Sequence, residues 1–456
     1  MSELISINPA TLEEVGRTPV SSPEDVDRVV REAAEAGKQW RNTSQRRRQG
    51  LLGACSVKLM QRQKEIAKVL SAEVGKTVED AGWEIWVASY AFAHAARVEF
   101  ESTAEAPDHA GRTITVERYP YGVVAAIVPW NFPAFLAAAK VASALAAGNT
   151  VVMKPAESVA LSMQKVIDVL NEVLPPGVVG IVQGGPEVGK ALIDHREVRK
   201  VSFTGSTKVG RVIMQQAAET LTPVTLELGG NDPAIVLDDA DLVYTASALA
   251  HSAFYNAGQM CIAPKRAYVP ADKVVEFNEH FAKAMSQLTV GDGSQPGVKV
   301  GPLHNKAQLD INKQLLDDAV SRGATVVAGG GRGTDLPGHF LEPTLVTGVD
   351  DSFDLVSQEQ FGTVFPVVGY TDVDRVVEVV NSQEYGLGAS VWGSEERATE
   401  IAHRIEAGTV WVNQHNSLEV DLPFGGVKQS GFGREGGTAG IDDFSQWRVI
   451  DVRRGG

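Results

Sequence analysis

From residue 123 onward the chain alternates short apolar runs with amphipathic stretches of helical character. The runs VVAAIV (123–128), TVVMK (150–154) and KVSF (200–203) suit strands buried on both faces, and a helical pattern follows each of them. This alternation is typical of a parallel sheet that is covered by helices on both faces. Ligands of such sheets bind at the carboxyl ends of the strands, where the chain turns into a helix.

A second alternating region follows the first, whereas two further segments alternate like strands but have no helix attached to them. We therefore predict an α/β fold in two domains with a small β arm. The first domain comprises residues 1–110 and 123–228, the second comprises 229–430, and the arm comprises 111–122 and 440–456. Exposed strands of this kind are commonly used to build oligomers, so we expect a homodimer or a homotetramer.

The composition excludes several classes of protein. The 456 residues include only two cysteines, Cys55 and Cys261, so a disulfide framework is excluded and a reducing compartment is favoured. A net charge of −15 argues against a nucleic-acid surface. No apolar run approaches the ~20 residues of a membrane span, the start lacks a secretory signal pattern, and no Cys/His/Asp cluster has metal-ligand spacing. We expect a cytoplasmic enzyme without a metal, nucleic-acid or membrane partner.

Cys261 lies in a loop between a helical run and a strand-like run, where functional side chains are often displayed. Other distinctive strings lie where predicted strands end or in loops that follow them. In order, they are VPWNFP (128–133), KPAE (154–157), FTGSTKVG (203–210), LELGGN (226–231), AGQMCIAPKR (257–266), QEQFGTVFPV (358–367) and LPFGGVKQSGFGRE (422–435). Together these strings resemble the aldehyde dehydrogenase superfamily, and the resemblance covers nearly the whole chain. It implies that the first domain is a Rossmann-like cofactor-binding domain, the second a catalytic domain and the arm an oligomerisation element.

The resemblance also implies a catalytic chemistry. A bare aldehyde has no hydride to release, so a nucleophile first forms a tetrahedral adduct, and Cys261 supplies the thiolate. The Asn131 amide and the Cys261 backbone N–H hold the oxyanion, and Glu227 activates the water that hydrolyses the thioester. Relatives that transfer the acyl group to coenzyme A tend to lack this glutamate, so the hydrolytic, non-acylating branch is favoured. Lys140 and Glu435 match positions that the family links to proton shuttling, although a salt bridge near the site explains them equally well.

The string FTGSTKVG places Gly205, Ser206 and Gly210 at the start of a helix, where free N–H groups and the helix dipole can receive a pyrophosphate. Lys154 and Glu157 are expected at the adenosine ribose. A carboxylate there accepts hydrogen bonds from ribose hydroxyls and repels a 2′-phosphate, so NAD is favoured, while Lys154 leaves NADP open. The other implied cofactor contacts are Val128, Pro129, Trp130, Leu228, Glu359 and Phe361. Thr363 stands where the family usually has proline.

By resemblance, the aldehyde tunnel is lined mainly by apolar side chains. These are Phe132, Leu136, Ala139, Met260, Ile262, Asn416, Leu418 and Phe424, with Trp86 and Tyr90 expected near the mouth. No arginine is among them to clamp a carboxylate, so we predict a neutral aliphatic or aromatic aldehyde. Succinate semialdehyde or a related semialdehyde is the alternative substrate, because short-chain relatives of that kind share GGVKQSG (425–431).

Two hypotheses other than an active aldehyde dehydrogenase stay open. A cysteine hydrolase would pair Cys261 with a histidine base, but none of the nine histidines lies in a recognisable motif. A catalytically silent scaffold of the same fold would be expected to have lost Cys261 or Glu227, and both are present. Formation of reduced nucleotide in the presence of an aldehyde separates the enzyme from both alternatives.

Overall fold

The structure is a computed structural model and describes residues 2–99, 103–105 and 112–453. Its first large sheet has six strands in the order β19-β9-β8-β5-β6-β7. Their bounds are β19 Gly431–Phe432, β9 Val224–Glu227, β8 Val198–Thr204, β5 Val123–Val128, β6 Thr150–Pro155 and β7 Val179–Ile181. Neighbouring strands from β9 to β7 run parallel, whereas β19 returns from late in the chain and pairs antiparallel with β9. Each strand predicted here from an apolar run is confirmed.

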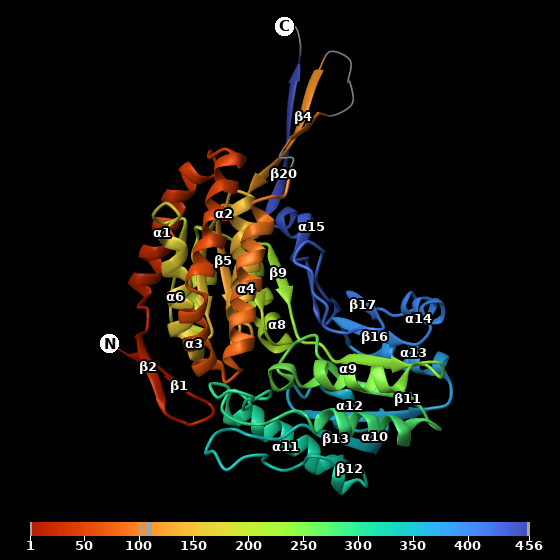
Figure 1. The fold of residues 1–456 in the computed structure, drawn as a ribbon. Helices are drawn as coiled ribbons and strands as arrows, with labels where there is room; N and C mark the ends of the chain where they lie inside the picture. The colour runs from red at the N-terminus through yellow and green to blue at the C-terminus, as the bar shows by residue number, and fades with distance from the viewer. Residues whose placement is uncertain (1, 100–102, 106–111, 454–456) are drawn as a thin grey trace.

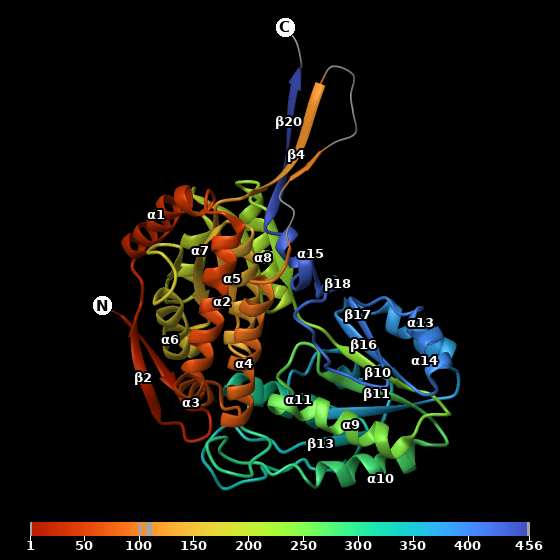
Figure 2. The same cartoon turned by 45° about the horizontal axis from the view of Figure 1, so that its top comes forward.

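Helices cover both faces of this sheet (Figures 1 and 2). They are α1 Pro23–Trp40, α2 Gln45–Gln61, α3 Gln63–Val74, α4 Val78–Ala95, α5 Pro133–Ala146, α6 Ala160–Asn171, α7 Pro186–Ile193 and α8 Thr207–Ala218, with the 3-10 turn η1 Glu157–Val159. Alternate residues of β5 explain the two layers. Val124 and Ala126 belong to a core shared with α2 to α6, whereas Val123 and Ala125 face a core shared with α1, α7 and α8.

The second large sheet has seven strands in the order β12-β13-β14-β11-β10-β16-β17. Their bounds are β12 Thr325–Ala328, β13 Thr344–Val349, β14 Val364–Tyr370, β11 Pro264–Pro270, β10 Asp232–Val236, β16 Gly388–Trp392 and β17 Thr409–Val412. Only β12 is antiparallel to its neighbour. The helices are α9 Leu242–Phe254, α10 Val274–Met285, α11 Lys306–Ser321, α12 Asp354–Ser357, α13 Val373–Ser382 and α14 Glu395–Ala402. The α/β class is therefore confirmed for both regions, while the boundaries given for the domains stay a prediction.

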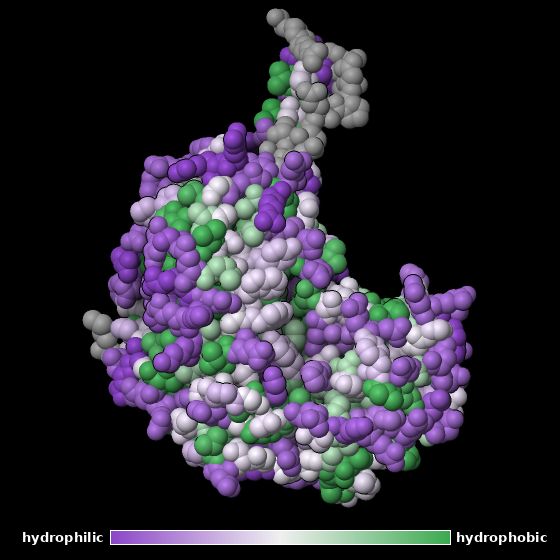
Figure 3. All heavy atoms as spheres, viewed as in Figure 1, coloured by the Kyte–Doolittle hydropathy of each residue, from purple (hydrophilic) through white to green (hydrophobic). Residues whose placement is uncertain are grey.

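A three-stranded arm projects from the body (Figure 1). It consists of β3 Thr103–Glu105, β4 Arg112–Pro120 and β20 Ser445–Arg453. The last two pair antiparallel over their full length, with Val116 opposite Val449, as their alternation predicted. Hydrophobic side chains are exposed on the arm (Figure 3), and on β20 Val449 is 63% and Trp447 64% accessible.

The remaining short elements join these parts. They are β1 Glu3–Ile7 and β2 Glu14–Pro19, which form a hairpin, the 3-10 turn η2 Tyr255–Gly258, the pair β15 Tyr385–Gly386 and β18 Val427–Lys428, and α15 Gly437–Asp442. Among the described residues no helix combines the length and apolar character that crossing a bilayer requires.

Candidate active site

Cys261 lies in the loop between η2 and β11, directly after a strained turn. Three consecutive residues of η2 have positive φ, namely Asn256 (50°), Ala257 (55°) and Gly258 (72°). For residues with a side chain this conformation costs roughly 1–2 kcal/mol each. A Cβ on Gly258 would lie 1.9 Å from the carbonyl oxygen of Gly362, so glycine alone fits there. Such strain persists only where the surroundings over-determine the backbone, and it is typical of functional loops.

Two cavities meet at Cys261. One is lined largely by apolar side chains, and the other lies at the carboxyl ends of β8 and β9. Cys261 and Asn131 are the two residues that line both of them. The cysteine is therefore placed where a group in one cavity can meet a group in the other.

The Cys261 thiol is protonated at neutral pH in this state of the protein. Burial raises its pKa to about 12, and the nearby carboxylates of Asp232, Glu359 and Glu227 act in the same direction. The ammonium of Lys265 opposes them, but its own pKa is lowered by burial. The site thus holds a thiol that has to lose its proton before it can act as a nucleophile.

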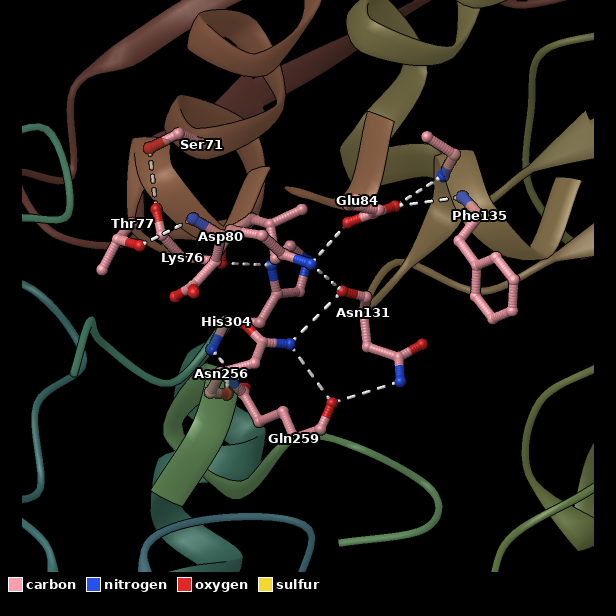
Figure 4. A network of polar contacts seen from close by, with 12 residues as sticks. Ser71, Lys76, Thr77, Asp80, Glu84, Asn131, Phe135, Asn256, Gln259 and His304 are labelled. Atoms are coloured by element: carbon pink, nitrogen blue, oxygen red, sulfur yellow. Dashed lines mark hydrogen bonds and ion pairs between the residues drawn. The ribbon is translucent and has the colours of Figure 1, made fainter. Parts of the chain in front are cut away.

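Asn131 is held by a ring of hydrogen bonds around the turn that leads to Cys261 (Figure 4). Its Nδ2 donates to the carbonyl of Gln259 at 3.1 Å, which uses one of the two amide N–H groups and leaves the other for a ligand. Asn256 Nδ2 donates at 3.3 Å both to that carbonyl and to the main-chain carbonyl of Asn131. The structure therefore holds the Asn131 amide beside the turn that leads to Cys261.

Glu227, the last residue of β9, is 3% exposed. Burial and the neighbouring Glu435 raise the pKa of its carboxyl well above the usual value. Neither carboxylate oxygen has a hydrogen-bond partner among the described residues. A Cβ on Gly425 would lie 2.7 Å from Oε1, so the glycine of PFGG makes room for this side chain. A carboxylate without partners and with a raised pKa is suited to take up a proton near neutral pH.

Lys140 and Glu435 form a buried ion pair beside Glu227. Lys140 comes from α5 and is fully buried, and Ser202 Oγ on β8 donates to Glu435 Oε1 at 3.4 Å. Main-chain hydrogen bonds in both directions tie Glu435 to Phe424, so the pair is attached to the wall of the apolar cavity. The geometry is that of a salt bridge, and it also places a proton donor and acceptor next to Glu227.

The second cavity gathers most of the predicted cofactor contacts. Its lining includes Pro129, Trp130, Gly205, Ser206, Leu228, Glu359 and Phe361. The Trp130 ring stacks on His304 with centroids 4.2 Å apart, and Phe361 meets it edge-on at 5.7 Å. Burial raises the pKa of Glu359 to about 7. The N-terminus of α8, capped by Ser206 Oγ, opens onto this cavity and is a ready site for a phosphate.

The remaining cofactor candidates lie outside that lining. Val128 is a buried residue of β5, and Gly210 packs on Leu228, where a Cβ would lie 2.6 Å from a leucine methyl group. Lys154 and Glu157 lie farther along the sheet edge, where a Cβ on Gly185 would be 2.7 Å from a carboxylate oxygen of Glu157. That site also contains Glu187, which the sequence reasoning missed.

The comparisons with known proteins agree with this geometry. A model of the "Aldehyde dehydrogenase family" matches residues 2–450. The chain belongs to the aldehyde dehydrogenase family. It is 37% identical to a "Probable succinate-semialdehyde dehydrogenase [NADP(+)]" of Sinorhizobium fredii, across 98% of this chain and 92% of the relative. It is 36% identical to the chloroplastic betaine aldehyde dehydrogenase of Beta vulgaris, across 96% and 90%.

Solved structures support the same assignment. Betaine aldehyde dehydrogenase of Staphylococcus aureus in complex with NAD+ superposes with a TM-score of 0.96 at 30% identity, covering 99% of this chain and 92% of that one. The predicted family, fold and class of activity are therefore confirmed. This aldehyde dehydrogenase oxidises aldehydes to carboxylic acids with NAD or NADP as the oxidant.

In this aldehyde dehydrogenase the apolar cavity contains most of the predicted tunnel residues. Phe132, Leu136, Ala139, Met260, Leu418 and Phe424 line it. Ile262 does not, because it is fully buried in the core and its carbonyl accepts a hydrogen bond from His415. Asn416 does not line it either, since its Nδ2 is turned toward the carbonyl of Ser252 at 3.1 Å.

The residues at the mouth of the cavity also differ from the expectation. Trp86 and Tyr90 stack on each other on α4 with centroids 5.8 Å apart, and neither lines the cavity. Trp83, one turn earlier on α4, lines it instead and meets Tyr255 edge-on at 6.1 Å. Helical periodicity shows that these aromatic residues share α4, but not which of them faces the cavity. Phe135 and His94 were also missed, because nothing in their local pattern marks them.

Proposed function

We propose that this enzyme oxidises a neutral aliphatic or aromatic aldehyde through a covalent adduct on Cys261. The observation that carries the proposal is the position of Cys261 and Asn131 on the boundary between an apolar cavity and a cavity at the strand ends. An aldehyde in the first cavity presents its carbonyl carbon to Cys261 Sγ and its oxygen to the free N–H of Asn131. The S–H bond breaks as the S–C bond forms, and the thiol proton passes to water in the cavity. Losing one donor of that kind typically costs about 10²–10³ in rate.

The second cavity suits a nicotinamide dinucleotide. The N-terminal turn of α8 faces a pyrophosphate, and Trp130 and Phe361 form an aromatic wall. A Cβ on Gly229 would lie 2.4 Å from Glu359 Oε2, so a bare backbone keeps that carboxylate accessible for a ribose hydroxyl. When bound, NAD+ supplies the acceptor for the hydride of the thiohemiacetal, which leaves a thioester on Cys261.

We assign hydrolysis of that thioester to Glu227. Its carboxylate takes a proton from a water molecule as the water attacks the acyl carbon. The C–S bond then breaks, the carboxylic acid is released, and Cys261 returns to the thiol form. The buried pair Lys140–Glu435 lies next to Glu227 and is the route by which the proton leaves. This assignment explains why a carboxylate is buried with no hydrogen-bond partner in the described part of the chain, since a purely structural glutamate there would be unfavourable.

The lining of the apolar cavity supports a neutral substrate. None of the described residues that line it is lysine or arginine. Its histidine, His94, provides no positive charge at neutral pH, because burial lowers its pKa. Desolvating a carboxylate without such a partner costs several kcal/mol. The relative from Sinorhizobium fredii carries a succinate-semialdehyde name, so succinate semialdehyde is kept as the alternative substrate.

We infer that NAD is preferred over NADP. A Cβ on Gly185 would lie 2.7 Å from an oxygen of Glu157 and 2.7 Å from an oxygen of Glu187, so two carboxylates converge there. Both repel a 2′-phosphate. Lys154 lies beside them, but burial lowers its pKa and its Nζ donates to the Pro155 carbonyl at 3.1 Å.

We also propose a cytoplasmic homodimer or homotetramer. Cys55 and Cys261 are both free thiols, which suits a reducing compartment. The exposed Trp447 and Val449 on β20 leave an apolar strand that a second copy can cover. Light scattering on the purified enzyme tests this, and a monomer at micromolar concentration would contradict it.

The deciding experiment measures NADH and NADPH formation with hexanal, benzaldehyde and succinate semialdehyde. We expect NADH with the two neutral aldehydes at a kcat/KM at least about tenfold above that with succinate semialdehyde, since tenfold corresponds to only about 1.4 kcal/mol. Cys261→Ala is the control and should form none. A preference for succinate semialdehyde would retain the mechanism but overturn the neutral substrate. No reduction with any aldehyde would favour a silent scaffold.

A further inference from the structure

A buried ion pair lies behind the proposed oxyanion site (Figure 4). Lys76 follows α3, and Glu84 lies two turns into α4. Lys76 Nζ is 2.6 Å from Glu84 Oε2, and both side chains are fully inaccessible. Burying two charges costs several kcal/mol per ion before their attraction is counted, so such a pair is weak evidence for stability alone. A specific positional role is the better-attested use of buried ion pairs.

The pair contacts the chain at the residue predicted to hold the oxyanion and at the helix start that follows it. Lys76 Nζ donates to the main-chain carbonyl of Asn131 at 2.7 Å. Glu84 Oε1 accepts from the backbone N–H groups of Ala134 at 2.8 Å and Phe135 at 3.3 Å, which are orphan donors at the start of α5. Lysine and glutamate thus fix the direction in which the chain passes from Asn131 into α5.

The carbonyl that Lys76 binds also belongs to the ring around the Cys261 turn. Asn256 Nδ2 donates to it at 3.3 Å and to the Gln259 carbonyl, which in turn accepts from the Asn131 amide. Moving the Asn131 main chain therefore moves its side-chain amide relative to Cys261. A displacement of about 1 Å at a catalytic group can cost 10²-fold in rate.

The backbone of Lys76 is itself constrained. Gly75 ends α3 at φ 95°, and a Cβ there would lie 2.7 Å from Pro9 and 2.8 Å from Pro302. Ser71 Oγ donates to the Lys76 carbonyl at 2.7 Å. The Lys76 ammonium also lies 3.7 Å from the centre of the Phe132 ring, which lines the apolar cavity. The lysine is therefore held from behind and directed at the segment 131–132.

We propose that Lys76 and Glu84 are positioning residues for the Asn131 amide and act on catalysis through the Asn131 main chain. The inference rests on the proposed function, because it requires Asn131 to hold the oxyanion. Neither residue reaches the cavities, so neither is expected to touch substrate or cofactor. Their loss should lower kcat while leaving KM for NAD+ unchanged.

The test is a double-mutant cycle between Lys76→Met and Asn131→Ala, with kcat/KM for hexanal as the measurement. Alone, Lys76→Met is expected to lower kcat/KM by about tenfold to a hundredfold. In the Asn131→Ala background it should cause no further loss, because the group it positions is absent. A merely structural role would give multiplicative losses, and that result would overturn the proposal.

Glu73 supplies a matched control. It is a buried glutamate that caps α6 through the backbone N–H groups of Leu161 at 3.0 Å and Ser162 at 2.8 Å, away from the site. Glu73→Gln should destabilise the protein without changing kcat, whereas Glu84→Gln should lower kcat. Thermal unfolding and NADH-binding fluorescence check the fold of each variant. Equal kcat for both glutamine variants would contradict the inference.

The outcomes separate this inference from the proposed function. If Asn131→Ala retains full turnover, the oxyanion assignment fails and the inference falls with it. If Asn131→Ala loses activity and Lys76→Met does not, only the positioning role fails. Should Lys76→Met not fold, Glu84→Gln and then the charge-neutral double variant carry the cycle. Failure of all three to fold would overturn the proposal, because the pair would then be a requirement of the fold.

Discussion

Replacing Glu227 with glutamine separates the two halves of the proposed reaction. The amide has the size of the carboxylate but cannot take a proton from water. Attack by Cys261 and loss of hydride do not require Glu227, so the first turnover should still produce one NADH per active site. Hydrolysis of the thioester should then be slow, and the acyl-enzyme should accumulate.

A positioned general base contributes about 10²–10⁴ in rate, or about 2.7–5.5 kcal/mol of activation free energy. We place Glu227→Gln within that range for steady-state kcat, because none of the described residues hydrogen-bonds to its carboxylate and could take the proton from water directly in its place. Stopped-flow absorbance measures the burst and the steady state in one experiment. Intact-mass measurement should show the acyl group on the variant, and Cys261→Ala should show neither burst nor adduct.

Glu227→Gln should raise the stability of the folded protein above neutral pH, although it lowers turnover. The folded pKa of Glu227 is raised above its unfolded value, so the protonated form is favoured in the folded state. Its contribution is fully present below the unfolded pKa and is lost as pH rises through the folded pKa, at about 1.4 kcal/mol for each unit of the difference. Glu227→Gln should therefore melt above the wild type at pH 8 and level with it at pH 4. With 456 residues, the melting temperature shifts by about 1 °C for each kcal/mol of stability.

Undiminished steady-state turnover in this variant, or the loss of its burst of NADH, would refute the assignment of Glu227 as the base that acts on the thioester.

Three further predictions follow from single observations. Gly258→Ala should lower both Tm and kcat, because its Cβ would lie 1.9 Å from the Gly362 carbonyl oxygen at φ 72°; a normal melting curve would contradict the strained turn. Alkylation of Cys261 by iodoacetamide without nucleotide should accelerate about tenfold per pH unit beyond pH 9, because its pKa is raised to about 12, and a rate plateau near pH 8 would contradict it. Glu187→Gln and Glu157→Gln should each raise the NADP-to-NAD ratio of kcat/KM by about fivefold, the equivalent of about 1 kcal/mol of repulsion, and an unchanged ratio would remove that residue from the ribose site.

Much of the fold could be predicted from the sequence because parallel strands buried on both faces leave a strong local signal. The run 123–128 is apolar throughout, and β5 has the same bounds, with alternate residues in two different cores. The strand β19 could not be predicted in the same way. It is two residues long and joins the first sheet from position 431, where its pairing with β9 depends on the rest of the fold.

The sequence predicts the central residues of the candidate site but not every residue that lines it. Cys261, Glu227 and Asn131 follow recognisable strings, and the structure places Cys261 and Asn131 on a shared boundary and Glu227 within electrostatic range of the thiol. The sequence places Trp86 at the mouth of the tunnel, whereas Trp83 lines the cavity. The two residues are less than one helical turn apart on α4, so helical periodicity does not decide which of them faces the cavity. Ile262 was expected in the tunnel because it adjoins the cysteine, but its side chain is fully buried in the core.

Charged residues that act from behind a site are the hardest to identify from sequence. Lys76 lies in the short connection between α3 and α4, and Glu84 lies on α4 eight positions later, so no local pattern shows that the two side chains meet. Only the packing of α4 against α5 shows that both side chains are buried, with Lys76 at the Asn131 carbonyl and Glu84 at the start of α5. The same holds for Glu187. Its sequence position is that of an ordinary glutamate in the first turn of α7, and only the structure shows that its carboxylate and that of Glu157 both lie next to Gly185. In both cases the residue type can be seen in the sequence, whereas the role of the side chain depends on a distant segment of the chain that the fold brings next to it.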